Sequence, residues 1–145
     1  MNIKLSKIAS LLSLDLIGAD TDIYNLSIDS REVKKGDFFV AIEGIKFDGH
    51  DYIQESISNG ACAILCNDRF DVSKINVPYI VCQDTLKSLA DLAAGYRKII
   101  GSPLTIGITG TNGKTTVTQL TTAILKQCFS VSTTLGNYNN DIGLP

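Results

Sequence analysis

The spacing of apolar residues along the chain predicts four helices. The first is a short amphipathic helix from about Leu5 to Leu12, and the others cover residues 50–58, 85–100 and 114–128. The third helix begins after a candidate N-cap at Asp84-Thr85 and ends at Gly101-Ser102-Pro103. Its predicted apolar stripe consists of Leu86, Leu89, Ala93, Tyr96 and Ile100.

Short apolar runs between turn residues predict the strands. Residues 23–28 (IYNLSI) alternate between apolar and polar side chains, as one strand with a single buried face would. Further strands are expected at 37–42, 61–66, 79–82, 104–109 and 131–134. Strands that alternate with helices predict an α/β fold, and Gly101-Ser102-Pro103 divides it into a domain over 1–101 and the start of a second over 102–145.

Composition and charge exclude several classes of protein. The chain has 145 residues, 44% of them hydrophobic and 19% charged, as expected of a globular protein. Its net charge of −2, without a cluster of Lys and Arg, argues against a nucleic-acid partner. The sequence shows no signal peptide, and no apolar run approaches the ~18 residues that span a bilayer, so no membrane partner is expected.

The cysteines are interpreted as buried thiols rather than as ligands. Cys62, Cys66 and Cys82 lie in or beside apolar runs, and Cys128 ends the fourth predicted helix. With His50, the pair Cys62 and Cys66 could form part of a zinc site, but their spacing matches no common one. No metal is therefore expected at these residues.

The segment GITGTNGKTT, residues 107–116, has the chemistry of a phosphate-binding loop. A strict P-loop would require glycine at position 108, which is isoleucine here. Glycines still allow backbone N–H groups to face an anion at a helix start, where Lys114 would reach the β- and γ-phosphates and Thr115 would hold Mg²⁺. The alternative is a glycine-rich turn with an exposed lysine. The candidate phosphate-binding residues are Gly110, Thr111, Asn112, Gly113, Lys114, Thr115 and Thr116.

Three motifs together resemble the Mur ligase family. The run TGTNGKTT is similar to that family's ATP loop, which has the pattern G-[TS]-x-G-K-[TS]. Upstream, Asp29-Ser30-Arg31 and the Gly-x-x-Phe-Asp-Gly-His loop at 44–50 resemble its amino-terminal domain. Downstream, GNYNNDIGLP at 136–145 looks like the segment after the ATP loop in the member that uses D-alanyl-D-alanine. The resemblance covers nearly the whole chain.

This resemblance implies a fold, an activity and a set of sites. The fold would be a small α/β substrate-binding domain followed by the start of a P-loop ATPase-type domain with a mainly parallel sheet. The reaction would join D-alanyl-D-alanine to UDP-N-acetylmuramoyl-tripeptide through an acyl phosphate, with ATP and Mg²⁺, in the bacterial cytoplasm. Lys114 and Thr115 would be catalytic, Ser30, Arg31 and Phe47 would face the uridine end of the substrate, and Asn137 and Asn140 would contact the substrate near the γ-phosphate.

The same resemblance implies that the chain is part of a longer, monomeric enzyme and is inactive alone. The family's acidic Mg²⁺ ligand, modified lysine, adenine-binding residues and carboxy-terminal domain have no counterpart in these 145 residues.

Several alternatives stay open at this point. The ligase that adds the third amino acid shares the first two motifs, and folylpolyglutamate synthase shares the ATP loop. A non-catalytic module that binds uridine nucleotides is the alternative from another class. From the residues alone, Asp29 and Arg31 could form a plain surface ion pair, and His50 could begin a helix without touching a ligand.

Overall fold

The computed structural model describes residues 2–44 and 47–133. It separates into two compact units, Met1–Tyr96 and Arg97–Pro145. The division lies in the last turns of helix α3 (Thr85–Ile99). The domain limits drawn from the sequence, 1–101 and 102–145, stay a prediction.

The first unit contains a five-stranded sheet in the order β2-β7-β6-β5-β4. Strands β4 to β7 run parallel to one another, and β2 pairs antiparallel with β7 at one edge. Two further strands, β1 and β3, form a separate antiparallel pair. The strands are β1 (Ile3–Lys4), β2 (Leu16–Ile17), β3 (Asp22–Ile23), β4 (Asn25–Ser27), β5 (Asp37–Val40), β6 (Ala63–Asn67) and β7 (Tyr79–Cys82).

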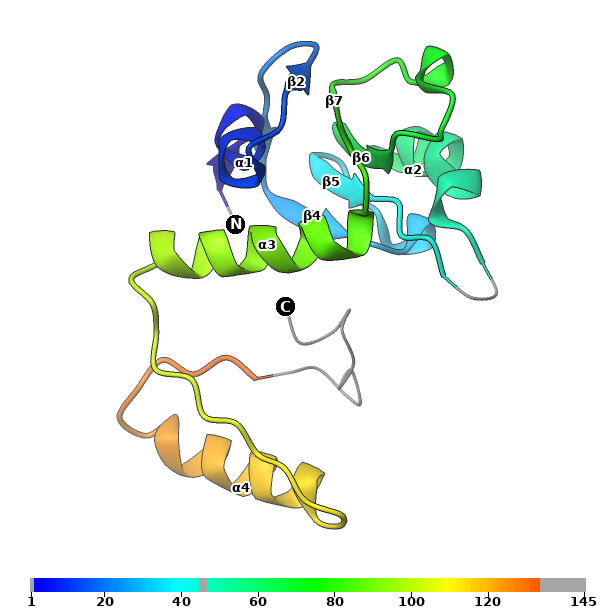
Figure 1. The fold of residues 1–145 in the computed structure, drawn as a ribbon. Helices are drawn as coiled ribbons and strands as arrows, with labels where there is room; N and C mark the ends of the chain where they lie inside the picture. The colour runs from blue at the N-terminus through cyan, green and yellow to red at the C-terminus, as the bar shows by residue number, and fades with distance from the viewer. Residues whose placement is uncertain (1, 45–46, 134–145) are drawn as a thin grey trace. The chain divides into compact units, whose positions relative to one another are not determined.

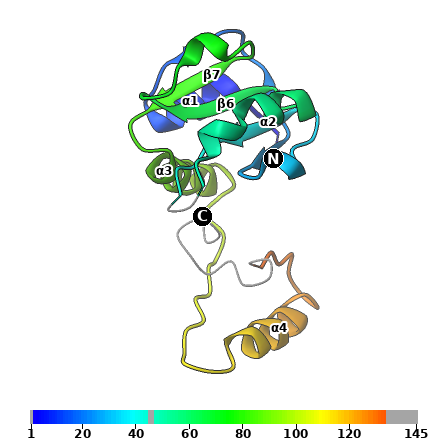
Figure 2. The ribbon, with the colours of Figure 1, turned by 90° about the vertical axis from the view of Figure 1, so that its right-hand side faces the viewer.

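Helices cover both faces of this sheet. Helices α1 (Leu5–Leu12) and α3 lie on one face and α2 (Ile53–Asn59) lies on the other, as Figures 1 and 2 show. Short 3₁₀ turns, η1 (Ser30–Glu32), η2 (Gly49–Tyr52) and η3 (Val72–Lys74), occupy the connections. The predicted α/β class is confirmed, and the sheet of the first unit is mainly parallel.

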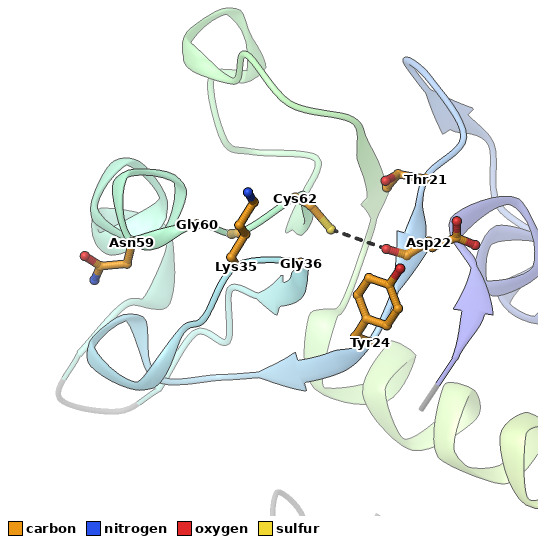
Figure 3. A pocket seen from close by; sticks show the side chains of 9 residues that line it. Thr21, Asp22, Tyr24, Lys35, Gly36, Asn59, Gly60 and Cys62 are labelled. Carbon is orange, nitrogen blue, oxygen red and sulfur yellow. Dashed lines mark hydrogen bonds between the residues drawn. The ribbon is translucent and has the colours of Figure 1, made fainter.

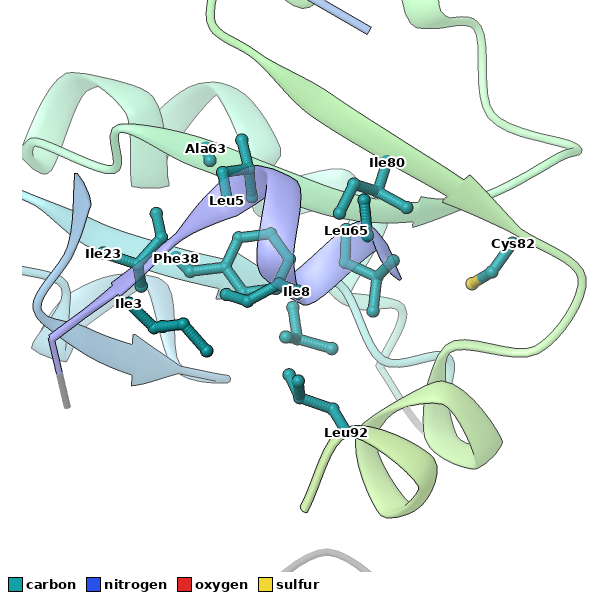
Figure 4. Close-up of a cluster of buried hydrophobic side chains, with 12 residues drawn as sticks. Ile3, Leu5, Ile8, Ile23, Phe38, Ala63, Leu65, Ile80, Cys82 and Leu92 are labelled. Atoms are coloured by element: carbon teal, nitrogen blue, oxygen red, sulfur yellow. The ribbon is translucent and has the colours of Figure 1, made fainter. Parts of the chain in front are cut away.

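The two central strands are buried on both faces, which explains their nearly continuous apolar sequence. Phe38 and Leu65 pack toward α1 and α3, in the cluster drawn in Figure 4. Phe39 and Ile64, their neighbours along the strands, pack toward α2. A buried side chain of this size stabilises the fold by about 1.5–3 kcal/mol, so these two strands hold the layers together.

Two of the predicted elements in this unit differ from the structure. The single strand expected at 23–28 is two strands, because Ile23 pairs with Ile3 in the small sheet and Asn25 already pairs with Asp37 in the large one. The helix expected at 50–58 begins as the 3₁₀ turn η2 and becomes α-helical at Ile53.

The apolar stripe predicted for α3 is wrong at its end. Ile100 lies beyond the last helical residue and is exposed, whereas Leu92 packs into the core. The predicted cap is confirmed at Asp84, whose Oδ1 accepts the backbone N–H of Lys87 at 2.9 Å.

The second unit is described as far as residue 133 and contains helix α4 (Lys114–Leu125). This helix confirms the prediction at 114–128 with an earlier end. Residues 104–109 and 131–133 do not form strands, so both strand predictions are wrong within the described residues. A strand exists only when a neighbour completes its ladder, and 104–109 have none in the described part of this unit: Leu104 is 91% exposed.

Gly60, the residue after α2, provides a test of this packing. Its φ is +114°, and a Cβ at this position would lie 2.9 Å from Cα of Lys35. We expect Gly60→Ala to lower the free energy of unfolding by about 2–3 kcal/mol, since it combines left-handed backbone strain with a contact against main chain. The measurement is urea unfolding followed by circular dichroism.

Gly95→Ala is the matched control. Gly95 lies inside α3, and its Cβ would meet only the Leu11 side chain, whose nearest atom is a terminal methyl carbon at 3.0 Å. Alanine gains about 0.8–1 kcal/mol of helix propensity here, so stability should stay the same or rise. Equal losses in the two variants would contradict the packing described for Gly60.

Candidate functional site

The candidate residues of the first unit follow the carboxyl ends of adjacent strands. Asp29-Ser30-Arg31 begins two residues after the end of β4, and the loop that bears Phe47 comes after β5. Since β4 and β5 are parallel neighbours, both segments leave the sheet at the same edge. Ligands of open α/β sheets bind at that edge, so the fold brings these motifs into a plausible binding region.

The Asp-Ser-Arg turn is fixed by its own side chains. Asp29 caps η1 by accepting the backbone N–H of Arg31 at 3.0 Å. The guanidinium of Arg31 also donates to both carboxylate oxygens of Asp29, at 2.9 and 2.6 Å. These hydrogen bonds, with that from the Arg31 side chain the largest contribution, lower the pKa of Asp29 to about 2.

Ser30 is buried between this turn and helix α2. Its hydroxyl donates to Oε2 of Glu55 at 3.0 Å, and its carbonyl accepts from Nδ2 of Asn59 at 2.9 Å. The hydroxyl therefore retains acceptor capacity for a ligand, while its proton is directed at Glu55. Arg31 is directed at Asp29 but is largely exposed.

Backbone hydrogen bonds join described residues on the two sides of the loop after β5, which bears Phe47. Glu43 and Asp48 form a β-bridge, the N–H of Gly44 donates to the carbonyl of Phe47 at 2.9 Å, and the N–H of Gly49 donates to that of Ile42 at 2.8 Å. Phe47 is 73% exposed. An exposed aromatic ring is suited to stack on a flat base.

His50 follows this loop and is buried, at 5% exposure. Its Nε2 accepts the backbone N–H of Asn67 at 2.9 Å, and its Nδ1 lies 2.5 Å from Oδ1 of Asp48. A nitrogen that accepts is unprotonated, so Nδ1 carries the proton and donates it to Asp48. Both ring nitrogens are thus bonded to the protein. Asn67 was not predicted from the sequence, although its place at the end of a buried strand is the kind of position where sites form.

In the second unit, the glycine loop leads directly into α4. Gly113 is the N-cap residue with φ +78°, a left-handed conformation that glycine adopts without strain. Lys114 is the first helical residue, and its Nζ donates to the carbonyl of Gly110 at 2.6 Å. The amine therefore lies over the loop, at the positive end of the helix dipole. Residues 110–116 are exposed, as a loop that receives a phosphate must be.

A separate hollow of about 740 Å³ lies at the opposite edge of the sheet. Figure 3 shows Lys35 and Gly36, which precede β5, beside Gly60 and Cys62, which precede β6. None of the site residues predicted from the sequence lines it. We place the candidate site at the carboxyl edge because the sequence motifs lie there and none of them lines this hollow.

The structure also places the cysteines and the remaining candidates. Cys66 and Cys82 are buried on opposite faces of the sheet, and burial raises the pKa of the Cys66 thiol to about 11. The described residues contain no group of three or more His, Cys, Asp or Glu side chains placed to hold a metal. Asn137 and Asn140 lie outside the described residues.

No helix in the described part of the chain is both long and apolar enough to cross a membrane.

Two family models match the chain in succession. The model described as "Mur ligase family, catalytic domain" matches residues 22–97, and "Mur ligase middle domain" matches residues 108–145. The chain is 36% identical over 145 residues to UDP-N-acetylmuramoyl-tripeptide–D-alanyl-D-alanine ligase of Escherichia coli, which covers 100% of this chain and 31% of that protein. It is also 38% identical over 126 residues to UDP-N-acetylmuramoyl-L-alanyl-D-glutamate–2,6-diaminopimelate ligase of Halalkalibacterium halodurans, covering 84% of this chain and 25% of that one.

Solved structures give the same result. The fold matches MurF from Acinetobacter baumannii with a TM-score of 0.88 and 27% identity, over 99% of this chain and 32% of that chain. It matches the MurF ligase from Thermotoga maritima in complex with ADP with a TM-score of 0.66 and 36% identity, over 83% of this chain and 27% of that one. The chain thus spans about a third or less of the length of these relatives.

The Asp-Ser-Arg turn makes a testable prediction about titration. In Arg31→Ala, we expect the pKa of Asp29 to rise from about 2 toward its ordinary 3.8 but not to reach it, because a backbone N–H still caps the carboxylate. Nuclear magnetic resonance titration of the carboxyl carbon measures this. Arg31→Lys keeps the charge without the paired donors and should give an intermediate value.

The direction of the pH effect on stability follows. The pKa of Asp29 is lower in the folded chain than in the unfolded chain. Its contribution to the free energy of unfolding is therefore present above about pH 4 and is lost as pH falls toward 2. An Asp29 that titrates near 3.8 in the wild-type chain would contradict the described turn.

Proposed function

The chain belongs to the Mur ligase family, and from that premise we propose that the full-length protein adds D-alanyl-D-alanine to UDP-N-acetylmuramoyl-tripeptide, with ATP. The product would be the pentapeptide precursor of peptidoglycan, made in the bacterial cytoplasm. We expect the enzyme to act as a monomer and the 145-residue chain to be inactive by itself.

One observation supports the proposal most strongly. A glycine loop ends in an N-cap with left-handed backbone, and Lys114 begins the helix with its amine over the loop. This is the geometry of a phosphate site. The relative from Thermotoga maritima, which matches 83% of this chain, is described in complex with ADP. The relative from Escherichia coli, which bears the name of this ligase, is 36% identical over all 145 residues, the span that holds Asp-Ser-Arg, Phe-Asp-Gly-His and the glycine loop.

The chemistry requires an activated carboxylate. An amine does not displace the oxygen of a free carboxylate at neutral pH, so the γ-phosphoryl group of ATP would first be transferred to the terminal carboxylate of the tripeptide. The amine of D-alanyl-D-alanine would then attack the acyl phosphate carbon and release inorganic phosphate. Phosphoryl transfer depends on alignment and on neutralising charge, both of which a rigid loop and a cation provide.

The residues of the glycine loop divide this work. The backbone N–H groups from Gly110 to Gly113 would bind phosphate oxygens, and the dipole of α4 would favour their negative charge. Lys114 would leave the carbonyl of Gly110, to which it now donates, and follow the migrating phosphoryl group.

Thr115 fits the role of a magnesium ligand. Its hydroxyl lies in the first turn of α4 and is exposed, and among the described residues it makes no hydrogen bond back to the helix. The hydroxyls of Thr118 and Thr122 do make such bonds, to the carbonyls of Lys114 and Thr118. Mg²⁺ would supply charge neutralisation between the phosphates.

The first unit would bind the uridine end of the substrate. Phe47 offers a stacking surface, Ser30 an acceptor oxygen, and the outer edge of the Arg31 guanidinium a donor toward a phosphate or carbonyl. These groups bind and orient the nucleotide-sugar and take no part in bond making. Asn137 and Asn140 remain candidates for contacts near the γ-phosphate.

The ligase that adds the third amino acid is the closest alternative, because a diaminopimelate ligase is similar to the chain at a comparable identity. The segment NYNNDIG at 137–143 favours the dipeptide-adding enzyme. Two separate assays of phosphate release distinguish them. The proposal requires release with UDP-N-acetylmuramoyl-tripeptide and D-alanyl-D-alanine, and none with the dipeptide precursor and diaminopimelate. The reverse preference would support the alternative.

Lys114→Ala tests the catalytic loop in the full-length enzyme. We expect kcat to fall by about 10²-fold or more, because the amine would act mainly on the migrating phosphoryl group. Thermal stability should change little, since the side chain is exposed. Lys126→Ala, at the other end of α4, is the matched control and should leave turnover unchanged. Near wild-type turnover by Lys114→Ala would remove the loop from the catalytic site.

Phe47→Ala and Ser30→Ala test the uridine assignment in the 145-residue chain. Each should weaken binding of UDP-N-acetylmuramoyl-tripeptide by roughly 1–3 kcal/mol, through lost stacking or a lost hydrogen bond. Isothermal titration measures this, with an ATP analogue and Mg²⁺ titrated separately. Tyr24→Ala is the control and should bind as wild type does. Tyr24 is an exposed aromatic residue beside Gly36, at the amino edge of the sheet. Tight binding that ignores Phe47 and Ser30 would exclude the assignment.

A further inference from the structure

A chain of hydrogen bonds connects the loop that bears Phe47 to the end of strand β6. Asp48 closes the loop through its bridge to Glu43, and its Oδ1 accepts from both the backbone N–H and Nδ1 of His50. On the far side of the same ring, Nε2 accepts the N–H of Asn67, the last residue of β6. The imidazole is therefore the only side chain in this chain of bonds that reaches both segments.

The environment of His50 leaves it little freedom. The residue is buried, its ring lies 5.7 Å from that of Phe70, and both nitrogens have partners. Burial opposes ionisation of Asp48, yet the hydrogen bonds from His50 outweigh it and lower the pKa of that carboxyl. A charged acceptor thus faces the Nδ1 proton, which fixes the neutral ring in one tautomer.

A second connection runs parallel to the first but is weaker. Arg69 donates its backbone N–H to Oδ1 of Asn67 at 3.2 Å and pairs through its guanidinium with Glu43 at the start of the loop. Both partners of this ion pair are about half exposed or more, so water screens it. Of the two side-chain connections, the one through His50 is the buried one.

We propose that His50 is a positioning residue for the nucleotide-sugar site, which holds the Phe47 loop in its binding form by joining Asp48 to the end of β6. This inference rests on the proposed function, in which Phe47 stacks on the base. His50 would touch no substrate, since both of its nitrogens bind protein groups. Its loss would lower the fraction of molecules whose loop is ready to bind and leave the chemical step intact.

The test compares kinetic constants of the full-length enzyme. His50→Gln retains an acceptor for the Asn67 N–H but loses the donor to Asp48, and His50→Asn does the opposite. Each should raise KM for UDP-N-acetylmuramoyl-tripeptide by about threefold to tenfold, as the loss of one hydrogen bond implies. The kcat and the KM for ATP should stay within about twofold of wild type. A role in stability alone would instead lower the folded fraction, and with it kcat, at unchanged KM.

Asp48 provides a second pair of variants at a more exposed position. Asp48→Asn keeps an oxygen that accepts both bonds from His50 and should retain a KM near wild type, whereas Asp48→Ala should raise it as the His50 variants do. Asp71→Ala is the matched control, because Asp71 caps the 3₁₀ turn η3 in the same way without a histidine. It should leave every constant unchanged.

The outcomes separate the two hypotheses. If Phe47→Ala raises KM for the nucleotide-sugar while His50→Gln and Asp48→Ala do not, the positioning role is wrong and the proposed function stands. If Phe47→Ala leaves KM unchanged, the uridine assignment of Phe47 is wrong and this inference fails with it, while the ligase activity stands. If the wild-type enzyme does not ligate, the proposed function itself fails.

Discussion

The parallel pairing of β4 to β7 is the constraint on which the rest of the first unit depends. Neighbouring parallel strands require the chain to return to the same starting edge each time, so every connection crosses a face of the sheet. β5 and β6 are buried on both faces, and a shift by one residue would exchange Phe38 and Phe39 between two differently shaped layers. The register is therefore fixed. As a consequence, segments that begin near residues 28, 41 and 67 all leave the sheet at one edge.

The elements that could be predicted from sequence are those whose pattern has one structural solution. A run such as DFFV is apolar throughout because both of its faces are buried, and it was recognised as a strand. The alternation at 23–28 has two solutions, since it also describes two short strands in different sheets. The apolar run at 104–109 was predicted as a strand, but a local pattern contains no information about whether a neighbouring strand is present.

The candidate site shows a similar division. The motifs identified the glycine loop, the Asp-Ser-Arg turn and Phe47, because each is a short run of residues whose chemistry is local. Asn67 and Glu55 were missed because their partners are distant in sequence. Asn67 bonds to His50, 17 positions away, and Glu55 bonds to Ser30, 25 positions away. His50 could be seen as a titratable group, but its tautomer depends on Asp48 and Asn67, which only the fold brings to it.

The hydrogen bond from Lys114 to the carbonyl of Gly110 affects the free energy with which a nucleotide would bind. When a nucleotide binds, the amine would give up its hydrogen bond to the carbonyl and form one to a phosphate oxygen. The gain in binding free energy is therefore the difference between two charge-assisted hydrogen bonds. Side-chain rearrangement at the surface takes picoseconds to nanoseconds, so this exchange would not limit the rate of association. The equilibrium affinity for a nucleotide would thus understate the importance of this lysine, whose full electrostatic effect would be felt only once charge begins to move between the two oxygens.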